Sequence, residues 1–230
     1  MNERKSPLPA IEAVVFDFDG TLAELHLDFG HMRAAILDLL GSYGLQSREF
    51  EHLYLLEMIE AGERRVAESA IERGKAFRTE AMLCIERMEV QAARQSRLYD
   101  GVKGMLSFIR NESILTGIIT RNCHRAVETV FPDYTRYVDA LLSREMTRRV
   151  KPDPGHLAEL LAHLQIDADR VLMVGDHPID IQVGKKLGTY TAAVLTGTGK
   201  PEELQRAQPD FLMGHVLEIL DIIPFAHQNP

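Results

Sequence analysis

The sequence is poor in cysteine and contains no tryptophan. Its 230 residues include two cysteines, Cys84 and Cys123, which form neither a C-x-x-C motif nor the spacing of a metal site. We therefore expect a reducing compartment and no disulfide framework, with both cysteines as packing residues. Met1 to Pro9 is polar and broken by two prolines. Because no apolar run is long enough for a signal peptide or a membrane span, we expect a cytoplasmic protein with no membrane partner.

Positive charge is also scarce. Lys and Arg number 26 against 34 Asp and Glu, which gives a formal net charge of -8. Nucleic acids and anionic membranes bind to basic surfaces, so this composition argues against both as partners. An anionic substrate would have to meet positive charge within a local site. The length suits one α/β core with a large insertion.

One short apolar run ends in two acids. Ala13 to Phe16 is too short for a helix and rich in β-branched valine, so it predicts a buried strand that stops before Gly20. Alternate side chains on a strand share a face, so Asp17 and Asp19 would lean into one pocket. Two carboxylates in one pocket need a shared proton or a bound cation, and Mg²⁺ fits best. Taken alone, this stretch leaves a second interpretation open, in which the acids only end the strand and begin a turn.

A long helical segment follows this strand. From about Phe29 to Leu98, apolar residues recur at helical spacing without a strand signal, which predicts three or four helices. Gly41, Gly44 and Gly62 are expected at helix ends. Basic residues here alternate with acids, which favours a solvated face over a ligand site. The expected domains are a helical insertion, residues 24–98, and an α/β core, residues 1–23 with 99–230.

Strands and helices alternate in the remainder of the chain. The expected helices are Val102 to Arg110, one ending at Val130, one ending at Leu164, and Pro178 to Leu187; the expected strands are Ile114 to Ile119, Val138 to Leu142, Arg170 to Asp176, and Thr191 to Leu195. Such alternation is typical of a parallel sheet with helices on both faces. Ligands of these sheets bind beyond the carboxyl ends of the strands, where Asp17, Thr120 and Asp176 fall.

Four motifs occur in order along these elements. They are Asp17-Phe18-Asp19-Gly20-Thr21-Leu22, Ile118-Ile119-Thr120-Arg121-Asn122, Lys151 in a Lys-Pro-Asp-Pro turn, and Gly175-Asp176-His177-Pro178-Ile179-Asp180. Together they resemble the motifs of the haloacid dehalogenase superfamily, in its phosphoglycolate phosphatase-like branch. The resemblance implies a Rossmann-like α/β core and identifies the inserted helices as a cap domain. It also implies that the chain is a Mg²⁺-dependent phosphatase of a small phosphorylated metabolite.

The same resemblance assigns chemistry to individual residues. Asp17 would be the nucleophile that becomes an aspartyl-phosphate, and Asp19 would protonate the leaving alcohol and then activate water. Lys151 would neutralise charge on the nucleophile and on the phosphoryl group, and Thr120 would hold a phosphate oxygen. The residues implied in phosphate binding are Gly20, Thr120, Arg121, Asn122 and Lys151.

The resemblance further implies a metal site. Asp17, Asp176 and the backbone carbonyl of Asp19 would bind Mg²⁺, which prefers hard oxygen ligands and few carboxylates. Asp180 lies one helical turn beyond Asp176. We expect it to support the site by orienting waters or Lys151, with direct binding of the metal as the alternative.

Several features leave alternatives open. Ala23-Glu24-Leu25 stands where many relatives of this branch have Val-Asp-Ser. We therefore expect a different cap hinge, and this departure argues against assuming that phosphoglycolate is the substrate. A 2-haloacid dehalogenase would have no use for Asp19 or a metal, whereas a phosphosugar mutase shares all four motifs. Thr198-Gly199-Lys200 is similar to part of a phosphate-binding P-loop. Val194 and Pro201 replace the first glycine and the final Ser/Thr, so we expect an ordinary loop.

Overall fold

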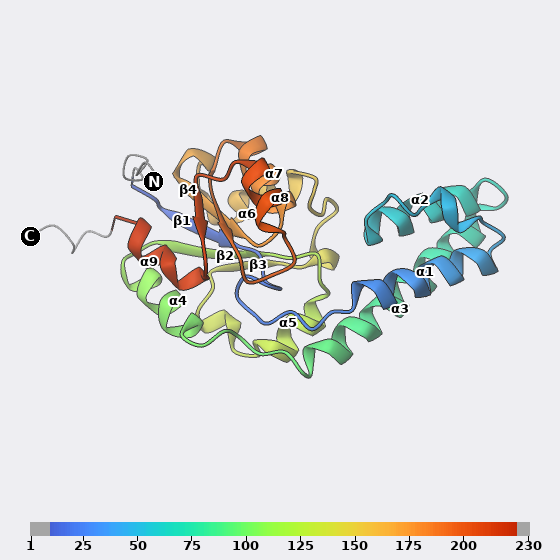
Figure 1. Cartoon of the computed structure of the whole chain (residues 1–230), viewed down its shortest axis with the longest axis horizontal. Coiled ribbons are helices and arrows are strands. Elements are labelled where there is room, and N and C mark those ends of the chain that lie inside the picture. Colours follow the sequence, from blue (N-terminus) through green and yellow to red (C-terminus); the bar gives the residue numbers. More distant parts are fainter. Residues whose placement is uncertain (1–9, 225–230) are drawn as a thin grey trace, which may run out of the picture. The chain divides into compact units, whose positions relative to one another are not determined.

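The computed structural model describes residues 10–224, so the expectation for Met1 to Pro9 lies outside the described residues. The chain divides into two compact units, Met1–Leu25 with Ser96–Pro230 and His26–Gln95 (Figure 1). None of the helices in the described part is long and apolar enough to cross a membrane.

The first unit is built on a parallel sheet of six strands in the order β3-β2-β1-β4-β5-β6. The strands are β1 (Ala13–Phe16), β2 (Leu115–Ile119), β3 (Ala140–Leu142), β4 (Val171–Gly175), β5 (Tyr190–Val194) and β6 (Phe211–Met213). The chain runs outward from β1 to β3 and then returns to β4 on the other side of β1. In Rossmann-like sheets of this order, ligands bind at the switch point between the two central strands. The predicted α/β core is confirmed.

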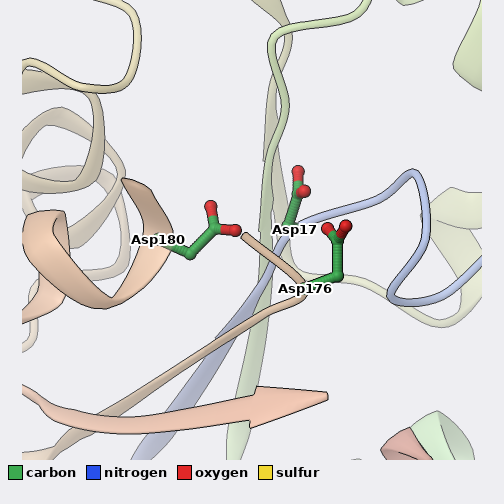
Figure 2. A group of neighbouring side chains, drawn as sticks. All are labelled: Asp17, Asp176 and Asp180. Carbon is green, nitrogen blue, oxygen red and sulfur yellow. The ribbon is translucent and has the colours of Figure 1, made fainter. Parts of the chain in front are cut away.

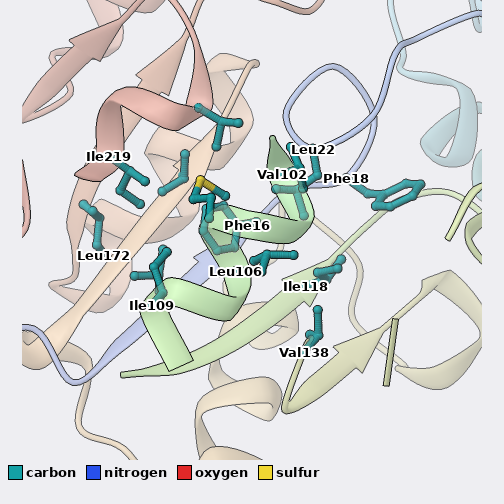
Figure 3. Packing of buried hydrophobic residues seen from close by; sticks show 14 of the residues in the cluster. Phe16, Phe18, Leu22, Val102, Leu106, Ile109, Ile118, Val138, Leu172 and Ile219 are labelled. Atoms are coloured by element: carbon teal, nitrogen blue, oxygen red, sulfur yellow. The ribbon is translucent and has the colours of Figure 1, made fainter. Parts of the chain in front are cut away.

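Helices cover both faces of this sheet (Figure 1). They are α4 (Val102–Asn111), α5 (His124–Val130), α6 (Gly155–Leu164), α7 (Pro178–Leu187), α8 (Pro201–Ala207) and α9 (Ile219–Ile222), with 3-10 turns at Tyr134–Arg136, Arg144–Met146, Ala168–Arg170 and Val216–Glu218. On β1, Val14 and Phe16 belong to a cluster that includes residues of α4. Figure 3 shows Phe16 beside Val102 and Leu106 of that helix. Ala13 and Val15 pack in another cluster with α6 and α7. This two-residue period places the strand between two apolar layers.

The second unit is a small helical domain. Its helices are α1 (Phe29–Ser42), α2 (Leu55–Ala67) and α3 (Ile71–Ala93), with a 3-10 turn at Ser47–Glu49. All three helices contribute to a separate apolar core, which includes Ile36, Met58 and Phe77. The sequence correctly predicts a run of helices without strands.

The expectation that Gly62 ends a helix is wrong. Gly62 lies inside α2, where a Cβ atom would come within 2.5 Å of Leu40 and 2.7 Å of Phe77. The glycine therefore lets α2 approach α1 and α3 closely. Gly44, with φ +84°, lies just beyond α1, as expected for a helix end, and Gly41 lies in the last turn of that helix.

Candidate active site

Three carboxylates meet at the carboxyl ends of the central strands. Asp17 follows β1, Asp176 follows β4, and Asp180 lies in the first turn of α7. One oxygen from each lies within 4.8 Å of the others. Figure 2 shows the carboxylates of Asp17 and Asp176 side by side, with that of Asp180 turned toward them. The register of the sheet explains this meeting, because Phe16 lies opposite Val174 in the neighbouring strand.

Lys151 inserts its ammonium group among these acids. Its Nζ donates hydrogen bonds to Oδ1 of Asp17 and to Oδ1 of Asp180, both at 2.7 Å, and its side chain is only 2% exposed. Burial alone would lower the pKa of Lys151, but the charges of Asp17 and Asp180 and the hydrogen bonds to both outweigh it and raise that pKa. Lys151 therefore stays charged, which satisfies the main condition for a buried ion pair.

One ammonium does not balance three carboxylates. Burial raises the pKa of Asp176 well above its ordinary value, and the charges of Asp17 and Asp180 raise it further. Burial also raises the pKa of Asp180 to about 6, although Lys151 acts against this shift. A divalent cation would offset these like charges, and carboxylate oxygens are ligands that Mg²⁺ prefers. The charge and the oxygen ligands of this carboxylate cluster therefore fit a bound Mg²⁺.

Asp180 is anchored through both of its oxygens. Besides the bond from Lys151 to Oδ1, the backbone N–H of His177 donates to Oδ2 at 3.1 Å. The second bond is part of the capping box that begins α7. Gly175 is needed nearby, because a Cβ atom there would overlap the Asp180 carboxylate. This arrangement suits the expected role of orienting Lys151.

Asp19 is held from the second motif. The side-chain amide Nδ2 of Asn122 donates to Oδ2 of Asp19 at 3.0 Å, and its Oδ1 accepts from the backbone N–H of Cys123 at 2.8 Å. The second bond fixes the orientation of the amide, so Nδ2 is the group that meets Asp19. Gly20 follows with φ +79°, the left-handed conformation that this turn requires. The acids of the first motif therefore have separate partners: Lys151 for Asp17 and Asn122 for Asp19.

Thr120 and Arg121 continue the same loop after β2. Thr120 is buried, and its hydroxyl accepts a hydrogen bond from the backbone N–H of Asn122 at 3.0 Å. The guanidinium of Arg121 donates to the backbone carbonyl of Lys151. The structure thus links the second motif to Lys151 through Arg121 and to Asp19 through Asn122. Phosphate binding by Gly20, Thr120, Arg121 and Asn122 stays a prediction, as does metal binding by the Asp19 carbonyl.

A family model for haloacid dehalogenase-like hydrolases matches residues 14–194. The chain belongs to this family. Over 222 residues it is 28% identical to an N-acetylmuramic acid 6-phosphate phosphatase from Pseudomonas aeruginosa, covering 93% of this chain and 95% of that protein. It is also 27% identical over 129 residues to the pyrophosphatase PpaX from Listeria monocytogenes, covering 54% of this chain and 58% of that protein.

Solved structures support the fold of this hydrolase. A predicted phosphoglycolate phosphatase from Haemophilus somnus superposes with a TM-score of 0.63 at 18% identity, covering 93% of this chain and 98% of that one. At 18% identity, this structural similarity is evidence for the fold alone.

Sequence reasoning missed His156, which lies beside Lys151 in the hydrolase. Its Nδ1 accepts from the backbone N–H of Lys151 at 3.3 Å, and its Nε2 lies 3.1 Å from the carbonyl of Leu142. Both bonds form together only when the ring is neutral and carries its proton on Nε2. Burial, followed by the charge of Lys151, lowers the pKa of His156 to about 4. No sequence signal indicates this burial beyond the place of His156 after the Lys-Pro-Asp-Pro turn.

His156 should make the hydrolase less stable in mild acid. The pKa of His156 is about 4 in the folded protein, below the ordinary 6.5. Between these two pH values His156 is protonated in the unfolded chain but neutral in the folded protein, so a fall in pH favours unfolding. This group should remove about 2 kcal/mol from the free energy of unfolding between pH 7 and pH 5. Urea unfolding at both pH values, in metal-free buffer, measures the loss.

The control for this prediction is His156→Gln, which keeps an uncharged polar side chain and cannot titrate. Other groups, including Asp180 with its raised pKa, contribute their own pH dependence to both proteins. The difference between the two proteins therefore isolates His156. The same loss of stability in His156→Gln as in the wild type would contradict the assignment.

Proposed function

We propose that the chain is a Mg²⁺-dependent phosphatase that hydrolyses a small phosphorylated metabolite through an aspartyl-phosphate intermediate. The observation that carries the proposal is the environment of Asp17. Its side chain is 14% exposed, one oxygen is bound by Lys151, and the carboxylates of Asp176 and Asp180 lie close enough to it for a cation to offset their like charges. Oδ2, the other oxygen of Asp17, is then available as a nucleophile.

The reaction follows in two displacements. Oδ2 of Asp17 attacks phosphorus, the ester P–O bond breaks, and Asp19 gives its proton to the leaving alkoxide. Asp19, now a carboxylate, takes a proton from a water molecule that attacks the aspartyl-phosphate. Inorganic phosphate leaves and Asp17 is restored. Bound Mg²⁺ would supply positive charge to the phosphate oxygens and to Asp17.

Lys151 contributes charge at both steps. When the Asp17 carboxylate becomes an acyl phosphate it loses its own negative charge, but Asp180 still pairs with the ammonium group at 2.7 Å. Lys151 therefore keeps its position and its proton throughout the cycle. Its charge can stabilise the phosphoryl oxygens in the transition state without any reorganisation.

We infer that the helical unit, residues 26–95, acts as the cap that selects the substrate. The two segments that connect it to the core are paired with each other. The backbone N–H of Glu24 donates to the carbonyl of Arg97 at 2.8 Å, and that of Tyr99 donates to the carbonyl of Leu22 at 3.0 Å. A hinge made of paired segments would move as one element, as cap closure requires.

The relatives suggest which substrates to test first. One has a name that specifies N-acetylmuramic acid 6-phosphate and another is named a pyrophosphatase. Both names describe phosphorylated small molecules with a phosphoryl group that can be transferred to water. A phosphorylated sugar, pyrophosphate and phosphoglycolate therefore form a compact first screen.

Removal of divalent cations should stop phosphate release. Without a cation, the carboxylates of Asp17, Asp176 and Asp180 would repel an incoming phosphate. We expect activity in EDTA to fall by about 10²-fold or more and to return when Mg²⁺ is added in excess. Phosphate release from the three substrates, with and without chelator, measures this effect. Full activity in EDTA would contradict the metal assignment, and isomerisation of a sugar phosphate without phosphate release would indicate a mutase.

A further inference from the structure

A loop of alternating threonine and glycine, Thr196-Gly197-Thr198-Gly199, contacts Asp176. It joins β5 to α8 and contains two residues of the triplet that is similar to part of a P-loop. The backbone N–H of Thr198 donates to Oδ2 of Asp176 at 2.7 Å, and the Thr198 hydroxyl donates to the same oxygen at 3.3 Å. The loop does bind an anionic oxygen, but that oxygen belongs to a carboxylate of the protein itself.

Both glycines of the loop are required by its close approach to Asp176. A Cβ atom at Gly197 would overlap the carboxylate, and one at Gly199 would overlap the backbone carbonyl oxygen of Asp176. Backbone atoms of the loop therefore pack directly against this acid. They leave no room on that side for the carboxylate to rotate.

The loop is also fixed to the turn of the first motif. The hydroxyl of Thr196 donates to the carbonyl of Gly20 at 2.6 Å, and the hydroxyl of Tyr99 donates to the carbonyl of Thr196 at 3.1 Å. A Cβ atom at Gly20 would come within 2.8 Å of Gly197 Cα, so the two turns are in contact. The loop thereby holds Asp176 in register with the segment that carries Asp17.

We propose that Thr196-Gly197-Thr198-Gly199 is a positioning loop that binds one oxygen of Asp176 and so presents the other, Oδ1, to the catalytic cation. Among residues 10–224, no group donates a hydrogen bond to Oδ1, whereas Oδ2 accepts both bonds from Thr198. A carboxylate held in this way is a one-oxygen ligand whose orientation is set before the cation arrives. The proposal rests on the proposed function, because the cation is the one inferred there.

The main test is Gly197→Ala, which places a methyl group against the Asp176 carboxylate. Isothermal titration of the substrate-free protein with Mg²⁺ should give a Kd about 10- to 100-fold higher than that of the wild type, as for other losses of support to a metal ligand. The matched control is Gly104→Ala, since Gly104 is exposed on α4 and its Cβ would have no neighbour within 4 Å. The control should bind Mg²⁺ like the wild type.

A second pair of variants keeps the test decisive even if Gly197→Ala does not fold. Thr196→Val removes the hydroxyl that binds Gly20, and Thr196→Ser retains it. Thr196→Val should raise the Kd for Mg²⁺ by about fivefold, the equivalent of one hydrogen bond, while Thr196→Ser stays close to the wild type. At saturating Mg²⁺ the kcat of Thr196→Val should return close to that of the wild type.

The outcomes separate this proposal from the proposed function. If the wild-type protein binds Mg²⁺ and both Gly197→Ala and Thr196→Val bind it equally well, the positioning role is wrong and the phosphatase assignment stands. If the wild type itself binds no Mg²⁺, the proposed function fails first. A loop with only a structural role would lower the unfolding temperature of the variants and leave the Kd of the folded protein unchanged, which would also overturn the proposal.

Discussion

Asp17→Asn is expected to lower phosphate release by on the order of 10⁴-fold or more, because it removes the nucleophile while preserving the shape of the side chain. Folding should survive, since Lys151 keeps its 2.7 Å bond to Asp180. Substrate should still bind, because one negative charge has been removed from the pocket. Steady-state phosphate release, with substrate binding measured by titration, checks both parts of the prediction.

A matched control for this prediction is Asp169→Asn. Asp169 is exposed and lies just before β4, at the opposite edge of the sheet from Asp176. The Asp169→Asn variant carries the same chemical change away from the carboxylate cluster, so its rate of phosphate release should equal that of the wild type. Phosphate release by Asp17→Asn within tenfold of the wild type would mean that another group attacks phosphorus, and the aspartyl-phosphate mechanism would fall.

The elements that sequence predicted best are those with local signals at both ends. Ala13–Phe16 has the expected bounds, because a short β-branched run stops at a turn that only Gly20 can make. Pro178 begins α7, and Gly188, with φ +80°, ends it, as predicted. In these cases the signal and the structure concern the same few residues.

Elements that depend on remote partners were predicted less well or not at all. Phe211–Met213 has three residues, with Leu212 exposed, so no apolar pattern distinguishes this strand from a loop; its pairing with β5 is what forms it. Gly62 has the sequence signal of a helix end but lies inside α2, where Leu40 and Phe77 of other helices come too close to leave room for a side chain. By contrast, α8 is absent from the sequence prediction although local signals for it exist: Pro201 in the first turn and the acids that follow.

The candidate site shows the same difference between features with a sequence signal and features that depend on remote contacts. The strand ends predicted that Asp17 and Asp176 lie close together, because parallel strands bring their carboxyl ends to one edge, and the resemblance in the order of the four motifs added Lys151. The sequence could not predict that Asn122 binds Asp19 or that Thr198 binds Asp176. These contacts join segments far apart in the chain, and side-chain direction at the end of a loop is not encoded in periodicity.

Asp19→Asn should damage the two half-reactions differently, according to the leaving group. General acid–base assistance is typically worth about 10²–10⁴ in rate, and an alkyl phosphate needs it in both steps. An aryl phosphate such as p-nitrophenyl phosphate has a good leaving group, so its first step should be largely spared. Its second step still needs activated water. We therefore expect the variant to lose alkyl-phosphate turnover and to release about one p-nitrophenol per enzyme in a burst, with phosphoenzyme accumulating.

Asn122→Ala is the control that separates chemistry from positioning in this last prediction. The Asn122 amide lies 3.0 Å from Asp19, so its loss should loosen the acid without removing it. Turnover should then fall less than in Asp19→Asn, and no burst should appear, because Asp19 can still activate water. If Asp19→Asn hydrolyses alkyl phosphates at the normal rate, Asp19 is not the acid–base. If the wild type instead releases halide from 2-haloacids faster than phosphate from any ester, attack occurs at carbon, where no leaving alkoxide needs the proton that Asp19 carries.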